Sequence, residues 1–119
     1  MTIVLKRAYE APAKADGTRI LVDRLWPRGL SKEKARIDLW LKEIAPTTEL
    51  RQWFAHDPAK WDEFQRRYRA ELDGNPGAVA ELKAAMTSGG RATLVYGARD
   101  EEHNDAVVLA AYLTAHPDS

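Results

Sequence analysis

The sequence has 119 residues, of which 45% are hydrophobic and 30% are charged, and its 18 Lys and Arg balance its 18 Asp and Glu. This length supports one domain over residues 1–119 with a core of its own, and the composition excludes a disordered chain. The neutral total disfavours a protein that wraps nucleic acid, and the lack of cysteine excludes disulfides, thiolate metal sites and thiol nucleophiles.

The first third of the chain predicts two strands and a short helix. Residues 3–5 form an apolar run typical of a strand, and residues 10–18 predict a loop because they contain proline and glycine. Residues 20–22 are apolar without alternation, as in a strand buried on both faces. Ser31 is placed to cap a short helical turn that runs through Ala35.

The segment 37–45 fits two patterns. Its apolar residues recur at spacings of three and four, which is typical of a helix. Between 37 and 42 they also alternate with other residues, which is typical of a strand. Periodicity alone therefore leaves both alternatives open.

The second half predicts four helices and a strand. Thr47 or Thr48 caps a helix that ends at Phe54, and Asp57-Pro58 is a typical start of the next helix. The remaining expected elements are a helix through 79–86 that ends at Gly89-Gly90, a strand at 92–96 and a helix at 104–115. Strands that alternate with helices favour an α/β fold with a small, mainly parallel sheet of about four strands flanked by helices. Ligands bind such sheets beyond the carboxyl ends of the strands.

Four stretches of the chain are distinctive: Leu21–Gly29, Trp40–Pro46, Trp53–Pro58 and Tyr96–His103. In this order they resemble the domain-of-unknown-function family numbered 488, in its short bacterial branch. The resemblance implies a single Rossmann-like α/β domain without an established activity, and a strand rather than a helix at 37–43. Many wider relatives carry a Cys-His-Arg run where this chain has His103-Asn104-Asp105, so thiol chemistry does not carry over.

The loop after residues 20–22 carries the strongest signal for a site. Arg24 and Arg28 could hold a phosphate or carboxylate, and Trp26 could stack on a ring. The structural alternative is that Asp23 pairs with Arg24 and that Trp26 belongs to the core. Two lysines at the start of the next helical turn favour the functional alternative, because a bound anion would offset their repulsion from the helix dipole.

Two later segments add candidates, each with a structural alternative. His56 beside Asp57 could form a general-base pair, or could simply end one helix while Asp57 caps the next. The residues after the last strand could form an acidic wall opposite the arginines, or an ordinary helix cap. The candidates for proton transfer are Asp23, Asp100 and His103. The candidates for ligand binding are Arg24, Trp26, Arg28, Lys42, Trp53, His56, Tyr96 and Arg99.

Motif searches give no further guidance on chemistry. The chain has no phosphate-loop, dinucleotide-binding, serine-elbow or zinc-helix motif, and its three histidines lack metal-ligand spacing, so we expect no cofactor and no metal. No apolar run could span a membrane and the N-terminus does not resemble a signal peptide, so we expect a cytoplasmic protein.

These observations support two hypotheses. The first is a domain that binds or acts on a phosphate-bearing, nucleotide-like small molecule at the carboxyl ends of its strands. The alternative is a non-catalytic module that binds nucleic acid or protein through the basic segment 19–36.

Overall fold

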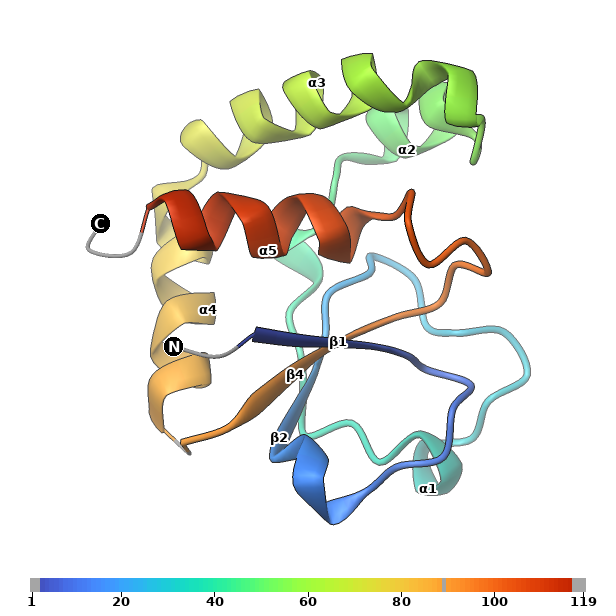
Figure 1. Cartoon of the computed structure of the whole chain (residues 1–119), viewed down its shortest axis with the longest axis vertical. Helices are drawn as coiled ribbons and strands as arrows, with labels where there is room; N and C mark the ends of the chain where they lie inside the picture. Colours follow the sequence, from blue (N-terminus) through green and yellow to red (C-terminus); the bar gives the residue numbers. More distant parts are fainter. Residues whose placement is uncertain (1–2, 89, 117–119) are drawn as a thin grey trace.

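Four parallel strands form one sheet in the computed structural model, which describes residues 3–88 and 90–116. The strands are β1 (Ile3–Arg7), β2 (Thr18–Leu21), β3 (Leu39–Trp40) and β4 (Ala92–Tyr96). Their order is β1-β4-β2-β3, so β4 lies inside the sheet (Figure 1), and all of its residues are buried. The predicted α/β fold with a small parallel sheet is confirmed.

The helices begin close to the predicted caps. They are α1 (Lys32–Ala35), α2 (Thr48–Phe54), α3 (Trp61–Asp73), α4 (Pro76–Ser88) and α5 (Asp105–Ala115), with short 3-10 turns at Lys14–Asp16, Lys42–Ile44 and Pro58–Lys60. The side chains of Ser31, Thr47 and Asn104 each accept a backbone N–H from the first turn of their helix. Of the glycine pair expected to end α4, Gly89 lies outside the described residues. No helix in the described ranges has the length and apolar content needed to cross a bilayer.

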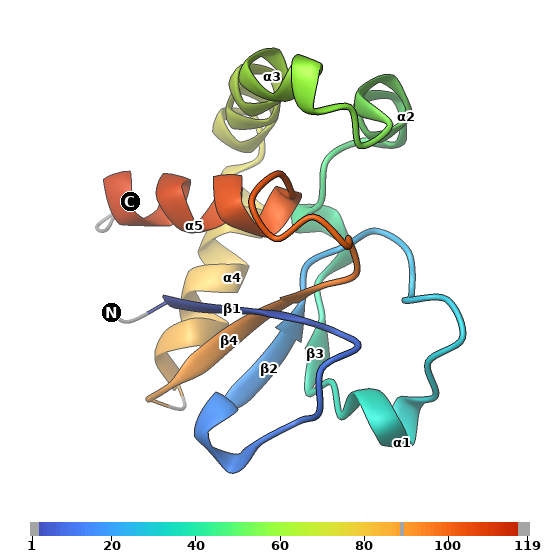
Figure 2. The same cartoon turned by 45° about the vertical axis from the view of Figure 1, so that its right-hand side comes forward.

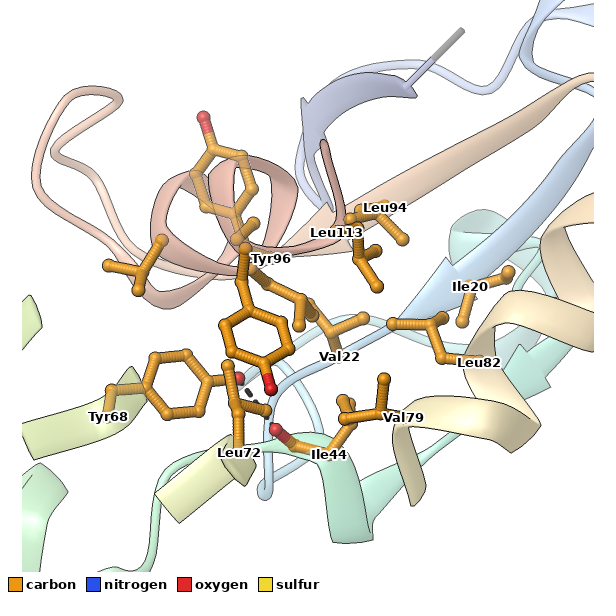
Figure 3. Packing of buried hydrophobic residues seen from close by; sticks show 14 of the residues in the cluster. Ile20, Val22, Ile44, Tyr68, Leu72, Val79, Leu82, Leu94, Tyr96 and Leu113 are labelled. Carbon is orange, nitrogen blue, oxygen red and sulfur yellow. Dashed lines mark hydrogen bonds between the residues drawn. The ribbon is translucent and has the colours of Figure 1, made fainter. Parts of the chain in front are cut away.

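The two faces of the sheet are covered differently (Figure 2). Ile20, Val22 and Leu94 point to one face, where helices α3, α4 and α5 cover them. Figure 3 shows this packing, in which the buried Tyr68 hydroxyl donates to the Ile44 carbonyl at 2.6 Å. Leu21 and Val95 alternate to the other face, where side chains of the segment 26–40 cover them.

The ambiguous segment 37–45 contains a strand, as the family resemblance implied, but only at Leu39–Trp40. These two residues pair with Ile20 and Leu21. The chain then crosses the sheet edge into a 3-10 turn, and Ile44 is buried among the helices on the opposite face from Trp40. Each periodic pattern therefore described only part of this segment, because its side chains pack on both faces of the sheet.

Thr47 links α2 to α3, and its replacement by alanine is expected to destabilise the fold by about 1–2 kcal/mol. Its hydroxyl accepts the Leu50 N–H and donates to Glu71 Oε2 at 2.6 Å, while its N–H donates to Glu71 Oε1 at 2.9 Å. Urea unfolding measures the loss. Thr47→Ser keeps the hydroxyl and should retain most of the stability, and equal losses for both variants would contradict this role.

Candidate functional site

A cleft of about 250 Å³ lies at the carboxyl ends of β2 and β4. The chain leaves β2 toward β3, whereas after β4 it turns into α5, which packs on β4 and β1. Neighbouring strands whose connections leave in opposite directions create a crevice between them, where ligands bind in open α/β sheets. The cleft therefore lies where this topology predicts a ligand site.

Two carboxyl groups meet in this cleft. Asp23 follows β2, and Asp105 is the first residue of α5; both line the cleft and their side chains share a hydrogen bond. The Gly97 N–H, just past β4, donates to Asp23 Oδ2 at 2.7 Å. A Cβ on Gly97 would lie only 3.2 Å from that oxygen, so glycine allows the carboxyl to approach the backbone. This contact ties the ends of β2 and β4 together across the crevice.

The acid pair holds a proton more tightly than isolated carboxyl groups do. Burial raises the pKa of Asp105 well above its usual range, and repulsion from Asp23 raises it further. Burial also raises the pKa of Asp23, against the lowering by its hydrogen bonds to Asp105 and Gly97 and by the nearby His56 and Arg51. The two carboxyls therefore titrate as an interacting pair, and both pKa values lie above the ordinary value of a carboxyl group.

Basic side chains line the same cleft as the acid pair. Arg24, Arg28, Arg51 and His56 line the cleft. The Arg24 guanidinium donates to the carbonyls of Pro46 at 3.2 Å and Ala45 at 3.3 Å. The segment that precedes α2 therefore holds the Arg24 side chain in place. Arg24 does not form the ion pair with Asp23 that was the structural alternative for this loop; among the described residues its hydrogen bonds are to these carbonyls. Three guanidinium groups thus line the cleft with two carboxyl groups.

His56 occupies a strained backbone position at this cleft. Its φ is +58° and that of Ala55 is +48°, a conformation that side-chain-bearing residues adopt at a cost of order 1–3 kcal/mol each. The turn directs the exposed His56 to the cleft, beyond the end of α2. Asp57 accepts the Ala59 N–H and caps the following turn, as the structural alternative for this segment predicted.

The loop before α5 contributes His103. Its Nδ1 lies 2.8 Å from Asp100 Oδ2, and its ring packs edge-on against Trp61 at 5.1 Å between centroids. Asp100 also accepts the N–H groups of Glu102 and His103, and these hydrogen bonds, the Glu102 one foremost, hold the pKa of Asp100 below its usual range. His103 lines the cleft, whereas Asp100 stands behind it and orients the imidazole.

Four predicted ligand-binding residues lie outside the cleft lining. The Lys42 ammonium lies 4.1 Å from the centre of the Trp40 ring, and the Arg67 guanidinium lies 4.2 Å from that of Trp53. Tyr96 is buried in the core, and Arg99 is exposed on the loop after β4. Trp26 does line the cleft, but its indole N–H donates to the Leu30 carbonyl and its ring packs edge-on against Trp40.

The basic segment 19–36 does not form one surface. Arg19 is buried and its Nη1 lies 2.7 Å from Asp16 Oδ2, while Arg24 and Arg28 line the cleft. Helix α1 lies beside the start of β2, because Arg19 donates to the Ala35 carbonyl at its C-terminus. The lysines of α1 therefore do not line the cleft with Arg24 and Arg28, and Lys34 lines a separate hollow with Ala8 and Tyr9.

Two charged cleft residues were not among the sequence-based candidates. Asp105 lies in the first turn of α5 and Arg51 in the last turn of α2, where acids and cations respectively are common in ordinary helices. The missing information was strand order: once β4 is placed next to β2, the helix that follows β4 must begin near Asp23.

Comparison with known proteins identifies the family. A family model described as the inactive DUF488-N3 subclade matches residues 2–118. The chain belongs to this family. The DUF488 resemblance inferred from the motifs is thereby confirmed.

Two uncharacterised bacterial proteins are similar to this chain along nearly their whole length. The uncharacterised protein Rv3073c of Mycobacterium tuberculosis (strain ATCC 25618 / H37Rv) is 42% identical over 107 residues, which cover 90% of this chain and 89% of the relative. The uncharacterised protein YeaO of Escherichia coli (strain K12) is 42% identical over 113 residues, which cover 95% and 97%. No solved structure matches the chain.

Proposed function

We propose that this DUF488 protein binds a small phosphate-bearing molecule, a class that includes nucleotides and sugar phosphates, in the cleft between β2 and β4. The observation that carries the proposal is the charge of the lining. Arg24, Arg28 and Arg51 line the cleft together with only two acidic residues, Asp23 and Asp105, in a chain whose formal net charge is zero. A concave site with such a local excess attracts anions, and guanidinium groups match the geometry of phosphate oxygens.

We favour a protein that binds its ligand without catalysing a reaction. The subclade to which the chain belongs is described as inactive. The cleft still contains groups that exchange protons, namely the acid pair and His103, but ligand binding alone accounts for the fixed Arg24 and the strained His56.

Ligand-induced stabilisation tests the proposal. We expect the melting temperature to rise with at least one member of a panel of nucleotides, sugar phosphates and inorganic phosphate, because a ligand at 100 times its Kd adds about 2.7 kcal/mol. Arg51→Ala and Arg24→Ala should reduce or abolish the rise. Arg69→Ala, which removes an exposed cation of α3 outside the cleft, should respond like the wild type. No rise with any phosphate, or an equal rise in all variants, would contradict the proposal.

The alternative, nucleic-acid binding through the basic segment, rests on the exposed cations of α1 and its C-cap, Lys32, Lys34 and Arg36. It predicts an affinity that falls steeply with salt and drops when these residues are replaced. We rank it second because Arg19 is buried and Arg24 and Arg28 line the cleft.

A further inference from the structure

We infer that the ligand of the cleft is a small phosphorylated polyol, such as a sugar phosphate, rather than a nucleotide. The inference rests on the proposed function, since the arginines are taken to hold the phosphate. It adds the identity of the group attached to that phosphate, from three properties of the cleft: its size, its aromatic residues and its acid pair.

The cleft is small for a nucleotide. Its volume of about 250 Å³ lies below the range of about 300–1,000 Å³ typical of small-molecule sites. A phosphate with a short chain or one sugar ring suits this space better than a ligand with a base attached. A dinucleotide would extend far into solvent.

The aromatic rings of the lining are already packed on neighbours. Phe54 and Phe64 stack on each other at 4.2 Å between centroids, and both are buried. The Arg7 guanidinium lies 5.3 Å from the centre of the Tyr9 ring, and Trp26 packs against Trp40. A nucleobase would have to displace these contacts to stack on Phe54, Phe64 or Trp26, which leaves it the 45% exposed Tyr9 ring.

The acid pair suits hydroxyl groups. Each carboxyl has about four lone-pair positions. The backbone donors to the pair are the N–H groups of Gly97, Asp105 and Ala106, so acceptor positions remain on both carboxyls. Carboxylates at strand ends accept hydrogen bonds from sugar hydroxyls in other α/β folds. A polyol phosphate would thus place its anion on the arginines and its hydroxyls on Asp23 and Asp105.

Calorimetric titration with a graded series tests this inference. The ligands are inorganic phosphate, ribose 5-phosphate, 2-deoxyribose 5-phosphate and AMP. We expect ribose 5-phosphate to bind about tenfold tighter than inorganic phosphate and 2-deoxyribose 5-phosphate, because the lost hydroxyl hydrogen bonds involve a charged acceptor. AMP should bind no tighter than ribose 5-phosphate. Asp105→Ala should remove the preference for the polyol, and Asp105→Asn, which keeps one acceptor oxygen, should retain part of it.

The outcomes separate this inference from the function on which it rests. Arginine-dependent binding of all phosphates with equal affinity, or tighter binding of AMP, overturns the polyol assignment and leaves the phosphate site in place. Failure of every phosphate to bind overturns both. The wild-type series decides the question even where the alanine variant does not fold.

Discussion

Replacing Arg19 with alanine is expected to lower the free energy of unfolding by about 3–5 kcal/mol, the usual cost of removing one partner of a buried ion pair. Arg19 is only 3% exposed, and its guanidinium donates to Asp16 and twice to the Ala35 carbonyl, at 3.1 and 2.8 Å. Its loss leaves the Asp16 carboxylate buried, with Lys6 as its one remaining ionic partner among the described residues. It also removes the side-chain donor to the Ala35 carbonyl at the end of α1.

Urea unfolding of the purified variant measures this loss. Lys32→Ala is the matched control, because it removes an exposed cation from the same segment and should change stability by no more than about 0.5 kcal/mol. A loss below about 1 kcal/mol for Arg19→Ala would mean that the contacts of Arg19 with Asp16 and Ala35 contribute little to the free energy of unfolding.

The same variant separates structure from binding. Arg19 belongs by sequence to the basic segment that could have contacted an anion, yet it lies outside the cleft. Under conditions where the variant remains folded, phosphate binding should match the wild type. A binding defect in folded Arg19→Ala would revive the basic segment as an interaction surface.

Local sequence patterns were enough to predict most of the fold. The side chains of caps such as Ser31 and Thr47 accept N–H groups of the turn that follows them. The start of a helix can therefore be predicted from a few neighbouring residues. The strand at 92–96 is equally local, since it is an apolar run that is buried on both faces. The segment 37–45 was harder because its side chains divide between two faces of the sheet, which no single periodicity describes.

The candidate site was only half predictable for a related reason. Asp23 could be found because it directly follows a buried strand, and strand ends are where ligands bind. Its partner Asp105 comes 82 positions later in the chain, and only the order β1-β4-β2-β3 brings the two carboxyls together. Lys42 and Trp53 lie outside the cleft, each in a cation–aromatic contact that the sequence does not distinguish from a ligand-binding position.

The acid pair makes stability depend on pH in a direction opposite to that of most carboxyl groups. A carboxyl whose pKa is raised on folding binds more protons in the folded state than in the unfolded chain, so its contribution to stability falls as pH rises. For Asp23 and Asp105 the contribution is fully present below their ordinary value of 3.8, and it is lost as pH rises through their raised pKa values.

Asp105→Asn is therefore expected to stabilise the protein at high pH and to have little effect near pH 4. Asparagine mimics the protonated carboxyl and cannot ionise, and its amide can donate to Asp23. We expect the variant to exceed the wild type by about 1–3 kcal/mol at pH 8, the penalty of a buried charge that lacks a full set of donors.

Urea unfolding of both proteins between pH 4 and pH 8 measures this difference. Glu81→Gln removes an exposed carboxylate from α4, outside the cleft, and its offset from the wild type should stay constant over the same range. Parallel pH profiles for wild type and Asp105→Asn would show that folding does not raise the pKa of Asp105. A difference that grows with pH would instead establish that Asp105 keeps its proton above its ordinary pKa, in the cleft of the proposed phosphate site.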